Sequence, residues 1–241
     1  MIQSSDNTTP LKIAIIGSRG YPYVYSGYET LIKELSERLV ERDCEVTVYC
    51  HRNLFKEKPV LVNGIKLVYV PTIETKSLSQ LIHSFLSICH AVVSEADVIF
   101  AVNAANGPFG LISKIFRKPT AINVDGLEWL RPKWKGLGAK YFKIAAHLST
   151  ILFDQIINDS EEMRKIYLNT FKKESVVIAY GATIKKSDDL SLIQQWPINS
   201  KEYYLVVGRM IPDNNADVIV KGFLASNSTK KMVVVGDVFY K

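Results

Sequence analysis

Two carboxylates, Asp125 and Glu128, follow an apolar run that is typical of a buried strand. Asp125 comes directly after the run, and side chains at the carboxyl ends of parallel strands often line a binding cleft. A carboxylate there could accept a hydrogen bond from a substrate hydroxyl or stabilise a developing positive charge. The stretch also fits an ordinary Asp-Gly turn. It therefore predicts a catalytic or binding role for Asp125, with Glu128 as a weaker candidate and the turn as the alternative.

A long glycine-bracketed loop, GSRGYPYVYSGYET, joins the first predicted strand to the first predicted helix. Gly17 and Gly27 permit close backbone approach, and free N–H groups at the helix start could receive a phosphate. The loop lacks the G-x-G-x-x-G dinucleotide fingerprint and the Walker pattern. Its residues Tyr21, Tyr23 and Tyr25 would suit contact with a ligand if they are exposed. A plain surface loop with turn glycines is the alternative.

A basic stretch, RPKWKGLGAKYFK, carries five cationic residues and no acidic one, and Trp129 lies just before it. Cations interleaved with aromatic side chains are the ingredients of peripheral membrane contact. Residues 129–143 therefore predict such contact, with an ordinary solvated helix as the alternative. A nucleic-acid partner is not expected, because no nucleic-acid motif accompanies the charge.

Predicted strands and predicted helices, which must position these residues, alternate along the chain. This alternation predicts an α/β fold with a doubly wound parallel sheet. The strands are near-continuous in Val, Ile and Ala, as expected for strands covered on both faces. We expect strands at 12–16, 45–50, 66–70, 97–102, 120–124, 155–158 and 175–179. We expect helices near 28–42, 78–94, 107–116, 138–152 and 161–168.

Composition and periodicity divide the chain into two regions. With 241 residues, 47% hydrophobic and 22% charged, it is long enough for one or two globular domains. We expect a disordered lead at 1–10, a domain at 11–185, a linker at 186–201 and the start of a second Rossmann-like domain at 202–241. Three cysteines without Cys-x-x-Cys spacing indicate a reduced, cytoplasmic compartment. The net charge of +6 favours an anionic partner.

Three separated segments carry a family resemblance. The segment IAIIGSRGYPYVYSGYETLIKELSERLVERDCEVTVYCHR, followed by NVDGLEWLRPKW and GRMIPDNN, resembles bacterial retaining glycosyltransferases of family 4, in particular their rhamnosyltransferase-like subgroup. These enzymes have the GT-B fold of two facing Rossmann-like domains. The resemblance implies that the first domain holds the sugar acceptor and the second holds the nucleotide-sugar.

The resemblance also implies roles for individual residues. The implied donor-binding residues are Gly17, Gly27, Tyr180, Gly181, Arg209 and Asn214. The implied acceptor-binding residues are Tyr21, Tyr23, Tyr25, Tyr28, Glu29 and Glu128. Arg209 would hold the donor diphosphate through its permanent charge and fork geometry. This chain departs from the family pattern in having Asp125 where His is common and Asn214 where Lys is common.

The implied function is metal-independent transfer of a hexose, with rhamnose as one candidate, from a nucleotide-sugar to a glycan or lipid-linked acceptor in cell-surface polysaccharide synthesis. No Asp-x-Asp motif is present, and we expect neither a cofactor nor a metal. The family's donor-gripping glutamate pair does not occur before the last residue, so we expect this chain alone to be inactive. A non-catalytic acceptor-binding module is the alternative function, and a nicotinamide-dependent oxidoreductase is disfavoured by the missing fingerprint.

Overall fold

The structure is a computed structural model that describes residues 9–22, 27–73, 75, 78–132, 134–184, 186–187 and 189–237. The chain forms two compact units. The first comprises Met1–Trp129 and Lys135–Tyr180, and the second comprises Leu130–Trp134 and Gly181–Lys241. The second unit begins before the stretch at 186–201 that the sequence predicts as a linker.

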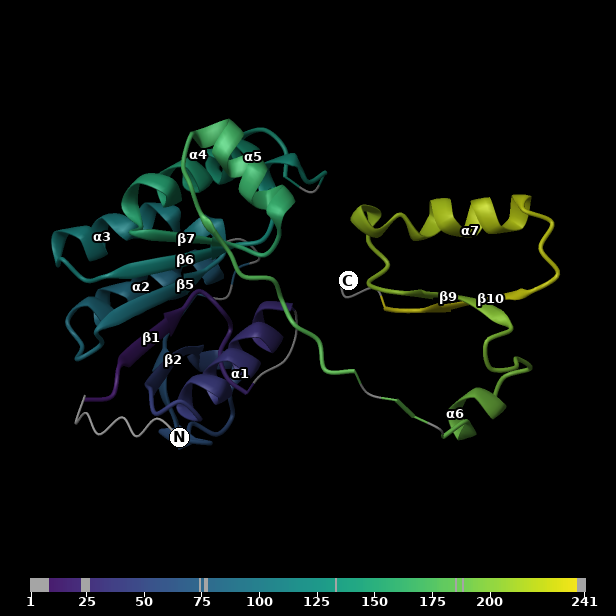
Figure 1. Ribbon diagram of the computed structural model, residues 1–241, viewed down its shortest axis with the longest axis horizontal. Helices are drawn as coiled ribbons and strands as arrows, with labels where there is room; N and C mark the ends of the chain where they lie inside the picture. Colours follow the sequence, from purple (N-terminus) through teal and green to yellow (C-terminus); the bar gives the residue numbers. More distant parts are fainter. Residues whose placement is uncertain are drawn as a thin grey trace, which may run out of the picture. The chain divides into compact units, whose positions relative to one another are not determined.

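The first unit is built on an eight-stranded sheet with strand order β3-β4-β2-β1-β5-β6-β7-β8. All neighbouring strands are parallel except β3, which pairs antiparallel with β4 at one edge. The α/β doubly wound fold predicted from the sequence is confirmed (Figure 1). The strands are β1 (Lys12–Ile16), β2 (Glu45–His51), β3 (Leu61–Val62), β4 (Ile65–Val70), β5 (Val98–Val102), β6 (Thr120–Val124), β7 (Gln155–Asn158) and β8 (Val176–Val177).

Helices cover the two faces of this sheet unequally. Ile32 of α1 (Gly27–Val40) packs with Ile15 and Val48 in one core cluster. The opposite face carries a larger cluster, to which Ile88 of α2 (Ser79–Val92) and Tyr167 of α5 (Glu161–Phe171) belong. The helices that follow α1 in the first unit are α2 (Ser79–Val92), α3 (Gly110–Ile115), α4 (Leu137–Leu152) and α5 (Glu161–Phe171).

Local chemistry explains where the predicted elements shift. The helix expected near 107–116 is divided into a 3-10 turn, Ala104–Phe109, and the short α3. Pro108 lies inside that turn and has no N–H to donate, which disfavours regular α-helix there. The strand expected at 175–179 is reduced to Val176–Val177. The edge strand β3 is too short to give an alternating pattern in the sequence, and it was not predicted.

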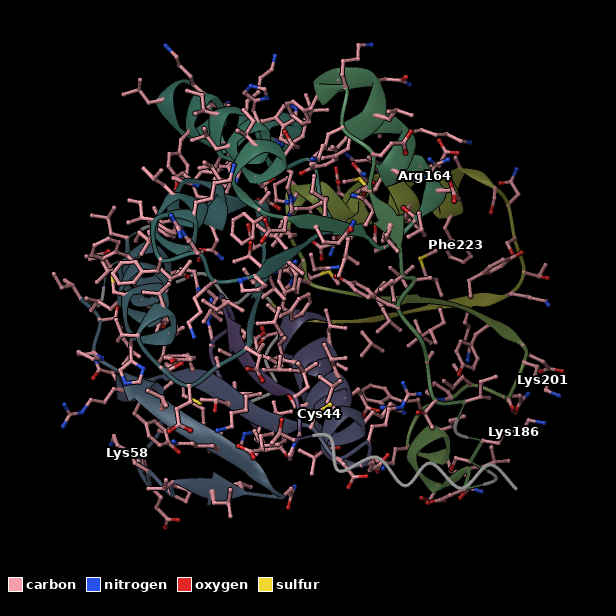
Figure 2. The ribbon with its side chains drawn as sticks, turned by 60° about the vertical axis from the view of Figure 1, so that its left-hand side comes forward. Cys44, Lys58, Arg164, Lys186, Lys201 and Phe223 are labelled. Carbon is pink, nitrogen blue, oxygen red and sulfur yellow. The ribbon has the colours of Figure 1, made fainter. Side chains whose placement is uncertain are left out.

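The second unit contains a strand–helix–strand motif. Strands β9 (Tyr203–Val207) and β10 (Lys231–Val235) are parallel and are connected through α7 (Ala216–Ala225). Tyr204 of β9 packs edge-on against Phe223 of α7 with ring centroids 5.7 Å apart. Phe223 is labelled in Figure 2. A short helix, α6 (Ser191–Gln194), precedes β9. In the part of the chain that the structure describes, no helix is both long and apolar enough to cross a membrane.

Candidate active site

Asp125 lies between two tyrosine hydroxyl groups at the carboxyl edge of the sheet. The Tyr28 hydroxyl donates a hydrogen bond to Asp125 Oδ1. The Tyr180 hydroxyl lies 3.3 Å from Asp125 Oδ2 and 2.7 Å from Oδ1 of the buried Asn123. Three residues that the sequence singles out, Tyr28, Asp125 and Tyr180, are therefore brought together from positions far apart in the chain.

The elements of the parallel sheet explain this convergence. Asp125 follows β6 directly, Tyr28 lies in the first turn of α1, and Tyr180 follows β8. In a doubly wound sheet the carboxyl ends of parallel strands and the first turns of the following helices meet at one edge. The first turn of α1 is placed there by the loop that leaves β1, so the three side chains meet although none is close to another in sequence.

Burial dominates the electrostatics of this cluster. Burial raises the pKa of Asp125 above its ordinary value, and the nearby carboxylates of Asp159 and Glu128 raise it further, whereas hydrogen bonds from Tyr28 and Tyr180 oppose the rise. Burial and the Asp125 charge likewise raise the pKa values of Tyr28 and Tyr180. Both phenols therefore stay protonated at neutral pH and act as hydrogen-bond donors.

Asn123 and Asp159 belong to the site's surroundings but were not predicted from the sequence. Asn123 is the penultimate residue of β6, and Asp159 follows β7 directly. Both positions carry the signal that identified Asp125, a polar residue at the carboxyl end of an apolar run. Applying that rule to every predicted strand would have found both.

The start of the glycine-rich loop is fixed against the sheet. Gly17 has φ +94°, and a Cβ there would lie 2.5 Å from the Val102 carbonyl oxygen, so a side chain cannot fit. Its own carbonyl oxygen accepts a hydrogen bond of 2.9 Å from Gln80 Nε2 of α2. The Arg19 carbonyl accepts from the His51 N–H at the end of β2. The first loop residues are thus part of the packed structure.

Two predicted acceptor-binding residues are buried, which corrects the expectation that they face a ligand. Tyr21 is only 1% exposed; its hydroxyl donates to Glu37 Oε1 and accepts from Asn63 Nδ2, both at 2.7 Å. Glu29 is 3% exposed, and its Oε1 accepts a hydrogen bond of 3.0 Å from the Arg19 N–H. Each side chain holds the loop in place. The other two loop tyrosines, Tyr23 and Tyr25, lie outside the described residues.

Two predicted donor-binding glycines, Gly27 and Gly181, have free space where a side chain would be. A Cβ added to Gly27 at the start of α1 would meet no atom within 4 Å, and the same is true of Gly181 in the second unit. Packing in this structure therefore does not require glycine at either position. Glu128 lies in a 3-10 turn, Glu128–Leu130, close enough to raise the pKa of Asp125.

Arg209 and Asn214 lie together at the carboxyl edge of β9 in the second unit. Arg209 is exposed, and its carbonyl oxygen accepts a hydrogen bond of 2.7 Å from Asn214 Nδ2. Asn214 therefore shapes the turn that presents the arginine. A Cβ on Gly236 would lie 1.9 Å from the Gly208 carbonyl oxygen, which shows how closely the two strand ends approach each other.

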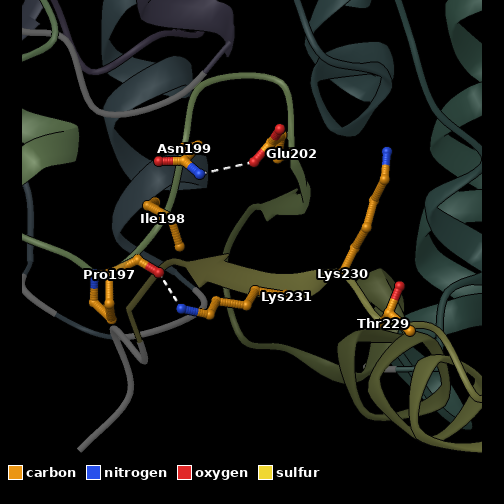
Figure 3. A pocket seen from close by; sticks show the side chains of 7 residues that line it. All are labelled: Pro197, Ile198, Asn199, Glu202, Thr229, Lys230 and Lys231. Carbon is orange, nitrogen blue, oxygen red and sulfur yellow. Dashed lines mark hydrogen bonds between the residues drawn. The ribbon is translucent and has the colours of Figure 1, made fainter.

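A cavity of about 360 Å³ lies elsewhere in the second unit, formed by residues of 197–202 and 229–231 (Figure 3). Asn199 Nδ2 donates a 2.8 Å hydrogen bond to Glu202 Oε2 beside it, and Lys231 donates to the Pro197 carbonyl. The cavity lies at the amino ends of β9 and β10, the edge opposite Arg209. It contains none of the predicted site residues.

Two aromatic side chains of residues 129–143 make contacts within the first unit. Trp129 packs against Tyr167 and Phe171 in the core, and the Tyr141 hydroxyl donates a 2.9 Å hydrogen bond to the Ala105 carbonyl. Trp129 and Tyr141 therefore make internal contacts, and membrane contact by residues 129–143 stays a prediction. Among the described residues, no group of three or more His, Cys, Asp or Glu side chains is arranged to hold a metal ion.

Comparison with solved structures defines the fold class. HepE of Anabaena, solved with UDP and glucose, aligns with a TM-score of 0.66 at 17% identity, covering 95% of this chain and 61% of that one. UGT89C1 of Arabidopsis thaliana, solved with UDP-L-rhamnose, aligns with a TM-score of 0.54 at 12% identity, covering 96% and 66%. UGT2 of Phytolacca americana, solved with UDP-2-fluoroglucose and pterostilbene, gives 0.54 at 11%, covering 96% and 72%. The chain has the Rossmann-like fold of GT-B glycosyltransferases.

The family is defined by sequence. The chain belongs to the family described as DUF1972, a domain of unknown function, whose model matches residues 11–183. That match contains Tyr28, Asp125 and Tyr180 but not Arg209. No curated protein matches the chain significantly. The chain spans 61% of the length of HepE, the first of the similar structures.

Proposed function

We propose that this chain is the acceptor-binding part, with the beginning of the donor-binding part, of a glycosyltransferase. The reaction is transfer of a hexose, with rhamnose as one candidate, from a nucleotide-sugar to a glycan or lipid-linked acceptor in cell-surface polysaccharide synthesis. The observation that carries this proposal is the Tyr28–Asp125–Tyr180 cluster at the carboxyl edge of the sheet. It occurs in a fold whose solved neighbours include UGT89C1, complexed with UDP-L-rhamnose, and UGT2, complexed with UDP-2-fluoroglucose.

The hydrogen bonds leave Asp125 with capacity to accept from a substrate. Oδ1 accepts from Tyr28, and Oδ2 accepts only a long hydrogen bond of 3.3 Å from Tyr180, whose hydroxyl lies 2.7 Å from Asn123 Oδ1. A carboxylate oxygen can accept more than one hydrogen bond. Asp125 Oδ2 therefore has capacity to accept from a sugar hydroxyl. In this proposal Asp125 binds and orients substrate, and its negative charge stabilises positive charge developing at the anomeric carbon.

The leaving diphosphate is assigned to cationic and backbone donors. Arg209 offers a permanently charged fork for bidentate contact with phosphate oxygens, and its turn is held by Asn214. The N-terminus of α1 at Gly27 brings the positive end of a helix dipole, which suits a phosphate. On this proposal the transfer proceeds with retention at the anomeric carbon and without a metal ion.

The proposal is tested by calorimetric titration with a panel of UDP- and dTDP-linked sugars. The panel is applied to this chain and to a longer version continued by about 130 residues, one domain of common size. We expect the longer version to bind a nucleotide-sugar and Arg209→Ala to abolish that binding. Arg38→Ala, which removes an exposed arginine from the last turn of α1, is the matched control and should leave binding unchanged.

The outcomes separate two function classes. Loss of donor binding in Arg209→Ala alone supports the glycosyltransferase. If neither version binds any nucleotide-sugar, the donor assignment is wrong. The chain would then be a non-catalytic module that binds glycan, and direct titration with glycans would become the decisive experiment.

A further inference from the structure

Three neighbouring helices, α2, α3 and α4, form a surface that carries no acidic residue. The sequence contains no Asp, Glu, Lys or Arg from 78 to 94, and no Asp or Glu from 98 to 124 or from 129 to 153. Helix α3 contacts both α2 and α4. Lys114 of α3 donates a 2.7 Å hydrogen bond to the Ile151 carbonyl at the end of α4, which fixes the two helices together.

Large apolar side chains are exposed on the outer sides of all three helices. Leu137 is 85% exposed and Ile115 is 69% exposed. On α4 the positions 137, 140, 144, 147 and 151 recur at helical spacing on one side, so Ile144 and Ile151 share an outward stripe with Lys140. We call the following exposed residues the apolar-basic face: Phe85, Leu86, Val93, Leu111, Lys114, Ile115, Phe116, Arg117, Leu137, Lys140, Lys143, Ile144 and Ile151.

The other helices of the first unit show what an ordinary solvated surface of this protein looks like. On α1, Lys33 pairs with Glu37 and Arg38 pairs with Glu34. On α5, labelled Arg164 in Figure 2 contacts Glu161, and Lys165 contacts Glu162. Those helices mix both signs of charge at close spacing. The contrast makes the apolar-basic face a distinct surface, and contiguous exposed apolar patches mark interaction sites.

We propose that the apolar-basic face docks onto an anionic lipid surface. Exposed Leu, Ile and Phe side chains would enter the boundary between headgroups and acyl chains, while the lysines and arginine contact anionic headgroups. The inference depends on α2, α3 and α4 of the first unit and not on the proposed sugar transfer. It differs from the expectation for residues 129–143, because the apolar contacts come from aliphatic residues and Phe116 and not from Trp129 or Tyr141.

The positive charge of the apolar-basic face favours a lipid surface over a second copy of the chain as its partner. Two copies placed face to face would bring Lys114, Arg117, Lys140 and Lys143 against the same cations, with no acid on the face to offset them. Like charges brought together in this way are unfavourable. An anionic bilayer offers complementary charge and an apolar layer together, which matches the two components of the face.

The first test is binding to vesicles in a flotation assay. We expect the chain to bind vesicles of phosphatidylglycerol and phosphatidylcholine in equal parts, to bind pure phosphatidylcholine much less, and to lose binding as salt is added. Lys140→Gln/Lys143→Gln should weaken the partition coefficient by about 30-fold, from roughly fivefold for each cation near an anionic surface. The matched control Lys33→Gln/Arg38→Gln on α1 should bind like the parent.

The second test removes apolar contacts without changing charge. Ile115 and Phe116 are exposed, so Ile115→Ser/Phe116→Ser should remain folded by circular dichroism while binding to the same vesicles at least about tenfold less well. Val60→Ser/Leu61→Ser, an exposed apolar pair on the first unit's β3 side, is the control. Absence of vesicle binding by the parent, or equal binding by the face variants, would overturn the proposal. Self-association abolished by Ile115→Ser/Phe116→Ser, without vesicle binding, would assign the face to a second copy.

Discussion

At the scale of single residues, Asp125 is a partly buried carboxylate that accepts hydrogen bonds from two tyrosine hydroxyl groups. Its net pKa is raised because burial outweighs the hydrogen bonds from Tyr28 and Tyr180. The folded chain therefore disfavours the charged carboxylate relative to the unfolded chain. A group kept charged at a stability cost is consistent with a role in function.

We predict that Asp125→Asn does not lower, and in fact raises, the free energy of unfolding at neutral pH. The destabilisation by ionised Asp125 is fully present above the folded pKa and vanishes as pH falls below the unfolded value, so the gain should disappear in acid. Urea denaturation at neutral and acidic pH measures it. Glu37→Gln is the control of opposite sign, because Tyr21 and Lys33 lower the pKa of Glu37. A lower urea midpoint for Asp125→Asn at neutral pH would contradict the assignment.

The buried side chain of His83 is expected to make the stability of the protein depend on pH. Burial, reinforced by the stacked His51 ring 3.9 Å away, lowers the pKa of His83 to about 3, and neither ring nitrogen makes a hydrogen bond of ordinary geometry. The unfolded chain binds a proton that the folded chain excludes, so stability falls as pH falls from about 6.5 towards 3, by about 1.4 kcal/mol per pH unit. Urea midpoints across this window should be less pH-dependent in His83→Leu. An unchanged slope would show that other groups control acid unfolding.

Three residues of this site were predicted from the sequence, and one was predicted wrongly. Asp125 was found because a polar residue after an apolar run is a local signal, and Tyr28 and Tyr180 followed from the family resemblance. Tyr21 was wrongly expected to be exposed. Its hydroxyl partners, Glu37 and Asn63, lie 16 and 42 residues away, so no local pattern reports its burial.

At the scale of secondary-structure elements, the strands were the best-predicted part. The bounds of β1, β6 and β7 agree with the sequence prediction, because each contains adjacent apolar residues next to polar ones, in KIAII, TAINV and QIIN. The turn before α3 and the antiparallel β3 were not predicted. A proline-containing 3-10 turn and a two-residue strand are too short for a periodic signal.

The contact between that turn and α4 gives an element-scale prediction. A Cβ on Gly107 would lie 1.9 Å from the Ala145 carbonyl oxygen and 2.8 Å from the Ser149 nitrogen, both backbone atoms of α4. We predict that Gly107→Ala lowers the free energy of unfolding by about 3 kcal/mol or more, since α4 must move away. Chemical denaturation measures the change. Gly181→Ala, where a Cβ meets open space, should stay within about 0.5 kcal/mol of the parent. Equal effects of the two substitutions would contradict the close packing.

At the scale of the whole molecule, the two units differ in the size of their sheets and of their buried cores. The first has an eight-stranded sheet with core clusters on both faces. The second has a two-stranded parallel sheet with one connecting helix, α7. Among the described side chains of α7, none is buried. A single strand–helix–strand motif buries too little apolar surface to be independently stable.

We predict that a fragment of residues 9–180 folds without Gly181–Lys241, the larger part of the second unit. Its thermal unfolding should be a single cooperative transition, with a melting temperature within about 4 °C of the parent's first-unit transition, which corresponds to less than about 1 kcal/mol. Near-ultraviolet circular dichroism follows the buried tyrosines of this unit. A fragment without a cooperative transition would show that the first unit depends on residues beyond Tyr180.

We propose that Asp125 serves sugar transfer, and the most direct measurement of this role is the transfer rate of the longer version with and without that carboxylate. The donor is the nucleotide-sugar found by titration, and glycan and lipid-linked acceptors are supplied as a panel. We predict that Asp125→Asn remains folded and binds donor, but lowers kcat/KM by about 100-fold or more, as removal of a single electrostatic stabiliser does. Asp125→Asn with the parent's transfer rate would contradict the account.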